Sequence, residues 1–250
     1  MKVREYFDEK PPQARSLDDG VGDYRNTHNF LKACLISSNV LPRSHLLDLG
    51  CGRGGDFLKY KRCQLKSYCG IDLSHENIQQ AAARAASSGI KCRVQLQCMD
   101  FTAQSFLRRG YYDVVSAQFS LHFAFQSRES ASGVVRQVSD NLRADGVFIG
   151  TIPIHVDKKT HDMVTVRLPG DDRAYEEFCA TSDDVVALCA EHGLACVFWV
   201  CFDAYFSRCA AEFPDLQACM HAFASPDANN AAFMFRKIGS PAPRTAGGGE

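Results

Sequence analysis

A glycine-rich turn, Gly50-Cys51-Gly52-Arg53-Gly54-Gly55-Asp56, is the strongest chemical signal in the sequence. It follows the short apolar run 45–49 and precedes a stretch, 57–62, with helical composition. Because a tight glycine turn before a helix N-terminus lets a ligand approach the backbone closely, this segment predicts a ligand-binding loop. Gly50, Gly52 and Gly55 also satisfy the G-x-G-x-x-G pattern of dinucleotide-binding proteins, so the loop alone leaves the ligand class open.

Acidic residues at the ends of three predicted strands narrow that class. Asp48 stands just before the loop, where a carboxylate would repel a pyrophosphate and suit a cationic, amino-acid-bearing ligand. Asp72 ends the second apolar run and can accept from both hydroxyls of a ribose. Asp100 and Phe101 follow the third run and offer an acceptor for an exocyclic amine and an apolar wall for a purine. Together these features favour S-adenosylmethionine over a nicotinamide cofactor, although any one acid alone is more often a surface residue.

The elements that must position these residues alternate between strand and helix. We expect strands at 45–49, 68–72, 92–98, 112–116 and 147–152, and helices at 26–40, 57–62, 76–86 and 127–142. Beyond Pro153 we expect a helix over 183–192 with Ser182 as its N-cap, and a closing hairpin of strands 194–202 and 231–237. This order predicts an α/β fold with a mostly parallel doubly wound sheet and a C-terminal antiparallel hairpin.

Length and composition predict one domain with short extensions. We expect an N-terminal arm at 1–24, one globular domain at 25–238 and a disordered tail at 239–250. With 46% hydrophobic and 23% charged residues, the chain is neither mostly disordered nor fibrous, and it contains no apolar run of membrane-spanning length. The N-terminus lacks the apolar core of a signal peptide. The twelve cysteines form no Cys-x-x-Cys pair, which favours reduced, mostly buried thiols in the cytoplasm or nucleus and no metal site.

Charge is divided unevenly along the chain. The net charge is −1, but residues 1–110 hold 17 Lys and Arg against 11 Asp and Glu, whereas residues 111–250 hold 11 against 18. Such asymmetry is compatible with an anionic partner for the first half and equally with a solvated surface.

Several stretches resemble the eukaryotic mRNA cap guanine-N7 methyltransferase family. The match covers roughly residues 24–153, and a weaker match continues to the end. The glycine turn occurs in many methyltransferases, whereas the last two of the following stretches are more specific to cap enzymes. The matching stretches are Asn29-Phe30-Leu31-Lys32, 46–56, Gly70-Ile71-Asp72, Gln118-Phe119-Ser120-Leu121-His122-Phe123-Ala124-Phe125 and Gly146-Val147-Phe148-Ile149-Gly150-Thr151-Ile152-Pro153.

The resemblance implies a role for each matching residue. Lys32 would reach the carboxylate of S-adenosylmethionine, Gly50 and Asp56 would line its methionine end, and Gln118 would lie beside the methyl group. Asp72 would bind the ribose and Asp100 the adenine. The residues implied at the capped RNA end are His122, Phe123, Pro153 and Glu176 around the guanine, Arg53 and Arg84 at the phosphates, and Asn29 elsewhere at the cap.

The sequence departs from the family pattern at three residues and in the length of one segment. Arg53 replaces a usual Lys and Phe123 replaces a usual Tyr, which removes a hydroxyl from the predicted cap pocket. Asn230 stands where the family has a Tyr, and the segment between Pro153 and Glu176 is short. These changes affect the expected recognition of guanine more than the fold or the cofactor.

The resemblance implies that residues 25–238 form a methyltransferase domain with the class I S-adenosylmethionine-dependent methyltransferase (Rossmann-like) fold. It also implies methyl transfer to N7 of the guanine in a GpppN-RNA cap. N7 has an in-plane lone pair and no proton, so we expect no acid or base catalyst, only positioning by Gln118, His122 and Phe123. We expect a monomer without a membrane partner, acting in the nucleus or cytoplasm, with other capping enzymes or a fused guanylyltransferase as possible associates. Two alternatives stay open: a methyltransferase for a small molecule or protein, and an inactive module that binds cap or cofactor in a capping complex.

Overall fold

The computed structural model describes residues 21–155, 157–167, 174–224 and 229–239. Most of the predicted arm and tail therefore lies outside the described residues. The strands are β1 (His45–Leu49), β2 (Ser67–Asp72), β3 (Arg93–Cys98), β4 (Tyr112–Gln118), β5 (Leu142–Pro153), β6 (Met163–Arg167), β7 (Ala174–Phe178), β8 (Leu194–Cys201) and β9 (Asn230–Lys237). The helices are α2 (Val21–Asn39), α3 (Phe57–Arg62), α4 (His75–Ser88), the 3-10 helix η1 (Leu121–Gln126), α5 (Arg128–Asn141), α6 (Ser182–Glu191), α7 (Phe202–Glu212) and α8 (Pro214–Cys219).

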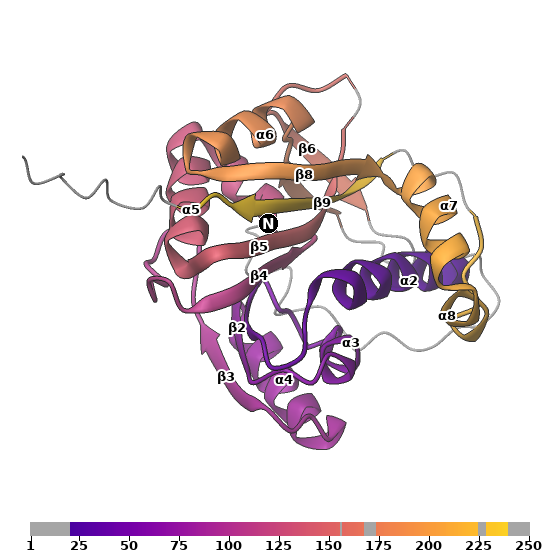
Figure 1. The fold of residues 1–250 in the computed structure, drawn as a ribbon. Coiled ribbons are helices and arrows are strands. Elements are labelled where there is room, and N and C mark those ends of the chain that lie inside the picture. Colours follow the sequence, from indigo (N-terminus) through magenta and orange to yellow (C-terminus); the bar gives the residue numbers. More distant parts are fainter. Residues whose placement is uncertain (1–20, 156, 168–173, 225–228, 240–250) are drawn as a thin grey trace, which may run out of the picture.

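Seven strands form one sheet in the order β3-β2-β1-β4-β5-β9-β8, and β6 pairs with β7 in a separate small sheet (Figure 1). The first five strands of that order are parallel, whereas β9 runs antiparallel to both β5 and β8. The chain order reverses between β1 and β4. In open α/β sheets, ligands bind beyond the carboxyl ends of the strands at such a switch point.

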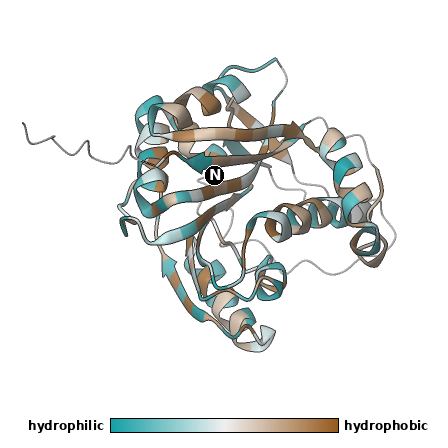
Figure 2. Ribbon diagram, in the orientation of Figure 1, coloured by the Kyte–Doolittle hydropathy of each residue, from teal (hydrophilic) through white to brown (hydrophobic). Residues whose placement is uncertain are grey.

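Both faces of the sheet are covered, so its central strands are buried throughout. On β1, Leu46 belongs to the hydrophobic cluster that includes residues of α2 and α3, whereas Leu47 belongs to the cluster on the opposite face, which includes residues of α5 and α6. This alternation follows from the two-residue period of a strand, and near-continuous apolar runs are typical of parallel strands covered on both sides. Figure 2 shows the resulting hydrophobic stretches along the strands of the sheet.

The structure confirms the predicted strand–helix order up to Pro153 and corrects several details. Helix α2 begins at Val21, so residues 21–24 belong to this helix and not to the arm. Thr181, not Ser182, caps α6, because its side chain accepts from the backbone N–H of Asp184. Strands β8 and β9 pair as predicted, but α7 and α8 lie between them in the chain, so they are not a simple hairpin. The pair β6–β7 and both inserted helices were not predicted.

Seven of the twelve cysteines are buried, and all twelve are free thiols. Cys34 and Cys69 are buried as predicted, whereas Cys196 is exposed on β8 and Cys201 is half-buried. Within the described ranges, no group of His, Cys, Asp or Glu side chains is arranged to hold a metal ion. Of the helices that the structure describes, none is both long and apolar enough to cross a membrane.

Candidate functional site

The glycine loop after β1 meets the segment after β4 at the switch point of the sheet. Gly50 has φ +70°, and a Cβ there would lie 2.4 Å from Cβ of Ser120. The Ser120 hydroxyl donates to the carbonyl of Leu49, and the N–H of Gly50 donates to the carbonyl of Ile71. Only glycine fits this position, because both the left-handed backbone and the close contact exclude a side chain.

Asp72 holds the glycine loop in place through a hydrogen bond to its backbone. One carboxylate oxygen accepts from the backbone N–H of Gly52 at 2.8 Å, and the other accepts from the N–H of Ser74 and the amide of Asn77, each at 3.0 Å. The buried carboxylate therefore ties the glycine turn to the first turn of α4. A carboxylate has about four acceptor positions, so this arrangement is compatible with the predicted ribose contact.

A cluster of charged side chains lies at the end of the glycine loop. Asp56 accepts from Lys32 of α2 at 3.0 Å and from Lys59 of α3, and Lys59 also donates to Asn29 at 3.0 Å. Burial alone would raise the pKa of Asp56, but the two ammonium groups outweigh it and lower the pKa well below its usual range. The structure thus brings together three of the predicted ligand-binding residues, with Lys32 directed at Asp56.

The two predicted phosphate-binding arginines lie beside the same loop. Arg53 donates from Nε to Asn77 at 3.1 Å, and its guanidinium is 3.9 Å from Glu76. Arg84 is exposed on α4, with a guanidinium nitrogen 3.9 Å from the position a Cβ would take on Gly55. Both cations therefore border the loop that precedes α3.

Three other predicted residues make hydrogen bonds or packing contacts within the protein. Gln118 donates to Ser116 and accepts from Thr151, so its amide is fixed in place. Asp100 accepts from both the N–H and the hydroxyl of Thr102. Phe101 is buried in the core on the α5 side of the sheet, which leaves little of its ring to act as the purine wall predicted from the sequence.

Asp48 lies under the loop, 3% exposed, and accepts from the Tyr68 hydroxyl at 2.7 Å. Burial raises the pKa of this carboxyl from 3.8 to about 7, although the hydrogen bond from Tyr68 opposes the shift. Near neutral pH the group is therefore partly protonated. This makes it a weaker partner for a cationic ligand than the sequence alone suggests.

The shift at Asp48 predicts a pH-dependent stability. Between about pH 4 and 7 the folded chain holds a proton that the unfolded chain has lost, so the free energy of unfolding should fall as pH rises through this window. From pH 5 to pH 8, we expect wild type to lose at least about 1 kcal/mol relative to Asp48→Asn, since one pKa unit corresponds to about 1.4 kcal/mol. Urea denaturation of both proteins at both pH values measures the difference, and parallel pH profiles would contradict it.

A cavity of about 620 Å³ opens next to the switch point. Its walls come from α2, from the segments after β4 and β5, and from β6, β7 and the start of β9. The lining residues are Tyr24, His28, Phe119, Phe123, Pro153, Ile154, His155, Lys158, Val166, Tyr175, Glu177, Asn229 and Asn230. Phe123 and Pro153 are thus placed at this cavity as predicted, and so is Asn230, where the family pattern has a Tyr.

The polar centre of the cavity wall is Glu177 on β7, which is 5% exposed. Its Oε1 accepts from the Tyr175 hydroxyl at 2.7 Å and lies 3.5 Å from Nε2 of His122. Its Oε2 lies 3.5 Å from Nε2 of His155. Burial lowers the pKa of His122 to about 4, with Glu177 acting in the opposite direction, so His122 is neutral at pH 7.

This geometry corrects two sequence-based assignments. Glu176 is exposed and does not line the cavity, because successive residues of a strand point to opposite faces and Glu177 takes the inward position. His122 is 2% exposed and lies behind Phe123, with ring centroids 4.0 Å apart, so it supports the wall and does not line it. His155 and Tyr175 also line the cavity and were not predicted; the alternation of Tyr175 with Glu177 could have indicated Tyr175, whereas no local signal indicates His155.

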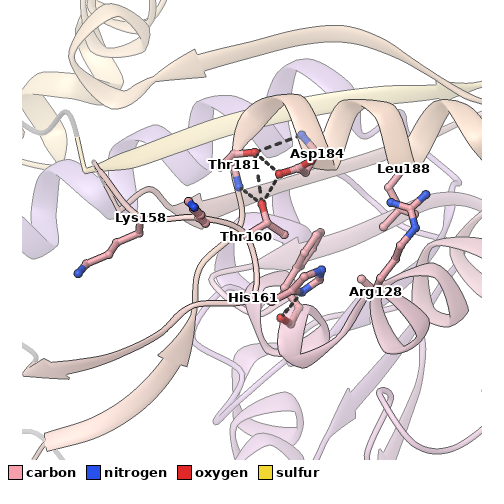
Figure 3. A pocket seen from close by; sticks show the side chains of 10 residues that line it. Arg128, Lys158, Thr160, His161, Thr181, Asp184 and Leu188 are labelled. Carbon is pink, nitrogen blue, oxygen red and sulfur yellow. Dashed lines mark hydrogen bonds between the residues drawn. The ribbon is translucent and has the colours of Figure 1, made fainter.

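A second cavity of about 420 Å³ lies between η1, α5, α6 and the 158–161 segment (Figure 3). Its polar groups are largely satisfied among themselves, since Thr160 and Thr181 both donate to Asp184 and His161 bonds to the carbonyl of Phe125. None of the residues predicted from the sequence lines it. The candidate functional site is therefore the glycine loop with the larger cavity.

Comparison with known proteins identifies the family. Residues 2–163 match the family model of the mRNA (guanine-N(7))-methyltransferase domain. The chain belongs to this family. The resemblance seen in the sequence is thereby confirmed, and membership supports S-adenosylmethionine as the cofactor.

Fungal cap methyltransferases are among the similar curated proteins. The mRNA cap guanine-N(7) methyltransferase of Eremothecium gossypii is 36% identical over 163 residues, which cover 60% of this chain and 38% of that protein. The corresponding enzyme of Saccharomyces cerevisiae is 34% identical over 163 residues, which cover 60% of this chain and 37% of the relative. The chain thus spans a little over a third of the length of these relatives.

Solved structures share the fold at low sequence identity. Geranyl diphosphate C-methyltransferase from Streptomyces coelicolor superposes with a TM-score of 0.63 and 11% identity, covering 94% of this chain and 97% of that one. An S-adenosylmethionine-dependent methyltransferase from Clostridium acetobutylicum gives a TM-score of 0.59 and 19% identity, with coverages of 87% and 93%. The predicted class I fold is confirmed.

Proposed function

We propose that the chain transfers the methyl group of S-adenosylmethionine to N7 of the guanine in a GpppN-RNA cap, in the nucleus or cytoplasm. One observation carries this proposal beyond family membership. The glycine loop held by Asp72 contacts Ser120, and the preceding residue, Phe119, lines a cavity whose wall presents a buried carboxylate, Glu177. A methyl-donor loop and a site for a hydrogen-bond-donating base therefore adjoin at the same end of the sheet.

The residues present fit the cofactor. Gly50 allows close backbone approach, the Asp72 carboxylate suits a ribose, and Lys32 with Asp56 offers charges of both signs for an amino-acid end. When bound there, S-adenosylmethionine supplies an electrophilic methyl on a sulfonium. The chain's part is to hold both reactants in line, which can contribute much of the rate enhancement.

The protein needs no proton acceptor for this step, because guanine N7 attacks through a lone pair. Neutral His122 and the fixed amide of Gln118 agree with a positioning role. Guanine becomes cationic on methylation, so the buried Glu177 carboxylate stabilises the developing charge. The apolar faces of Phe123 and Pro153 border the base, and Arg53 and Arg84 take the cap phosphates.

Methyl transfer from labelled S-adenosylmethionine to an unmethylated GpppA-capped RNA tests this function. We expect incorporation into that RNA, and none into the same RNA with a cap already methylated at N7 or into uncapped RNA. Incorporation into metabolites or proteins alone would favour a different methyltransferase. Cap binding without any transfer would favour an inactive module.

Arg53 predicts a salt-dependent contact. Each cation that neutralises a phosphate contributes about 0.7 to the slope of log affinity against log salt for a single strand. Arg53→Ala should flatten that slope for GpppA-RNA by about this amount and leave the affinity for S-adenosylmethionine nearly unchanged. Titrations from low to moderate salt measure it.

Arg109→Ala is the matched control for that titration. Arg109 is exposed before β4, at the opposite end of the sheet, and 3.8 Å from Asp140. Its variant should keep the wild-type slope. If Arg53→Ala also keeps the wild-type slope, Arg53 makes no phosphate contact.

A further inference from the structure

The second cavity, of about 420 Å³, falls in the size range of small-molecule sites. Its lining contains three cationic side chains, those of Arg128, Lys158 and Lys159, and one carboxylate, that of Asp184. Both lysines are exposed, and within the described part of the chain their ammonium groups make no hydrogen bond or ion pair. Arg128 gives one N–H to Glu191 and has others left for a ligand. The cavity therefore has an excess of positive charge that a phosphate group can neutralise.

The imidazole of His161 has a fixed orientation at this cavity. Its Nδ1 lies 2.8 Å from the carbonyl oxygen of Phe125, so Nδ1 carries the proton and donates it. The ring stacks on Phe125 with centroids 6.2 Å apart and 26° between the planes, while the residue remains exposed and lines the cavity. Nucleic-acid bases stack on aromatic faces of this kind, histidine included. His161 therefore offers a flat surface for a base.

Asp184 supplies a hydrogen-bond acceptor in the same cavity. Thr160 and Thr181 both donate to its Oδ2, and these bonds lower the pKa of the carboxyl, so the group is ionised at neutral pH. Its Oδ1 accepts no hydrogen bond from the described residues. Figure 3 shows the hydrogen-bonded threonines and Asp184 above His161 and Arg128. A carboxylate oxygen in this position can accept from the hydroxyls of a ribose.

A flat ring, an acceptor and several cations match a nucleotide better than a simple anion. Inorganic phosphate would gain from the cations, but the Asp184 carboxylate would repel it and the imidazole face would stay unused. A nucleotide uses all three features. We propose that the second cavity is a binding site for a nucleoside monophosphate, with the base on His161, the ribose at Asp184 and the phosphate at Lys159 and Arg128.

This site is separate from the larger cavity and does not depend on the identity of the methyl acceptor. Lys158 lines both cavities, so the nucleotide can come from solution or from an RNA chain bound next to the site. Both sources present the same base, ribose and phosphate to His161, Asp184 and Lys159.

Calorimetric titration with AMP, in excess S-adenosylhomocysteine to keep AMP out of the cofactor site, tests the proposal. Wild type should bind AMP about five- to tenfold more tightly than ribose 5-phosphate, which has no base to stack. His161→Asn should bind the two nearly alike, because asparagine tolerates the left-handed backbone of residue 161 (φ +74°) but has no ring. Lys159→Glu should weaken the binding of both by at least about tenfold, through the loss of a charge-assisted contact.

His192→Asn and Lys91→Glu are the matched controls for these two variants. His192 bonds Ser132 and does not line the cavity, and Lys91 is an exposed residue just before β3. Both controls should bind AMP as wild type does.

The trinucleotide pApApA distinguishes the two sources. Tighter binding of pApApA than of AMP, lost in Lys159→Glu and His161→Asn, would support the site with an RNA chain as the source. Equal or weaker binding of pApApA would support it with a free nucleotide. If wild type binds AMP no more tightly than inorganic phosphate, or if both variants bind AMP as wild type does, the cavity is not a nucleotide site.

Discussion

Glu177→Gln should lower kcat/KM for methyl transfer to a GpppA cap by about 10- to 100-fold. Glu177 is buried in the cavity wall and is flanked by Tyr175 and two histidines. The amide replaces one acceptor oxygen by a donor, which leaves a desolvated N–H of guanine unpaired at a cost of about 1–3 kcal/mol. It also removes the charge that stabilises the methylated, cationic base.

The adjacent residue supplies the control for that measurement. Glu176→Gln makes the same chemical change on the same strand, but this side chain is exposed. We expect its kcat/KM to stay within about twofold of wild type. An inosine cap, which lacks the N2 amine, should suffer less from Glu177→Gln than the guanine cap does. Equal losses in the two variants, or none in either, would show that Glu177 does not bind guanine.

Asp72→Asn should weaken binding of S-adenosylmethionine by about 10- to 100-fold. The variant amide has one acceptor oxygen for the ribose and for three donors of the chain, those of Gly52, Ser74 and Asn77. A hydrogen bond that involves a charged group contributes about 1.5–3 kcal/mol, and the glycine turn also loses its anchor. Isothermal calorimetry with S-adenosylmethionine measures the change in Kd.

Asp113→Asn is the matched control for Asp72→Asn. Asp113 also accepts from a backbone N–H, that of His45, and pairs with Arg143, but it lies at the amino end of β4, away from the glycine loop. Its Kd should equal that of wild type. An unchanged Kd in Asp72→Asn would exclude this strand end as the ribose site.

The parallel part of the sheet was predictable because its local signals agree with its packing. Strands β1, β2 and β4 and the second half of β5 are mostly apolar, and β3 alternates between polar and apolar residues. Each of the helices α4 and α5 begins after a serine whose side chain accepts from the backbone. The pair β6–β7 carries no such signal. Its strands, with the sequences Met-Val-Thr-Val-Arg and Ala-Tyr-Glu-Glu-Phe, mix polar and apolar residues and are fixed by pairing with each other.

The same contrast between local signals and tertiary pairing explains which residues of the site were predicted. Gly50 and Asp72 were predicted because strand ends and a tight turn determine where they lie. Two adjacent glutamates cannot be told apart in this way, since a shift of one residue exchanges the two faces of a strand. The register that pairs Glu177 with Val164, and Glu176 with Thr165, is a tertiary feature. His155 was not predicted at the cavity because its contact with Glu177 joins segments that are distant in sequence.

The position of β9 also governs the order in which the sheet can be assembled during synthesis. Among the described strands, β9 (residues 230–237) is the last to leave the ribosome, yet it lies between β5 and β8. Until they emerge, both neighbours present unpaired backbone edges, and that of β8 belongs to the uncharged sequence Leu-Ala-Cys-Val-Phe-Trp-Val-Cys. Exposed apolar edges of this kind associate with other chains. A nascent chain that stalls before residue 230 is therefore prone to aggregate, whereas one released after Lys237 can close the sheet.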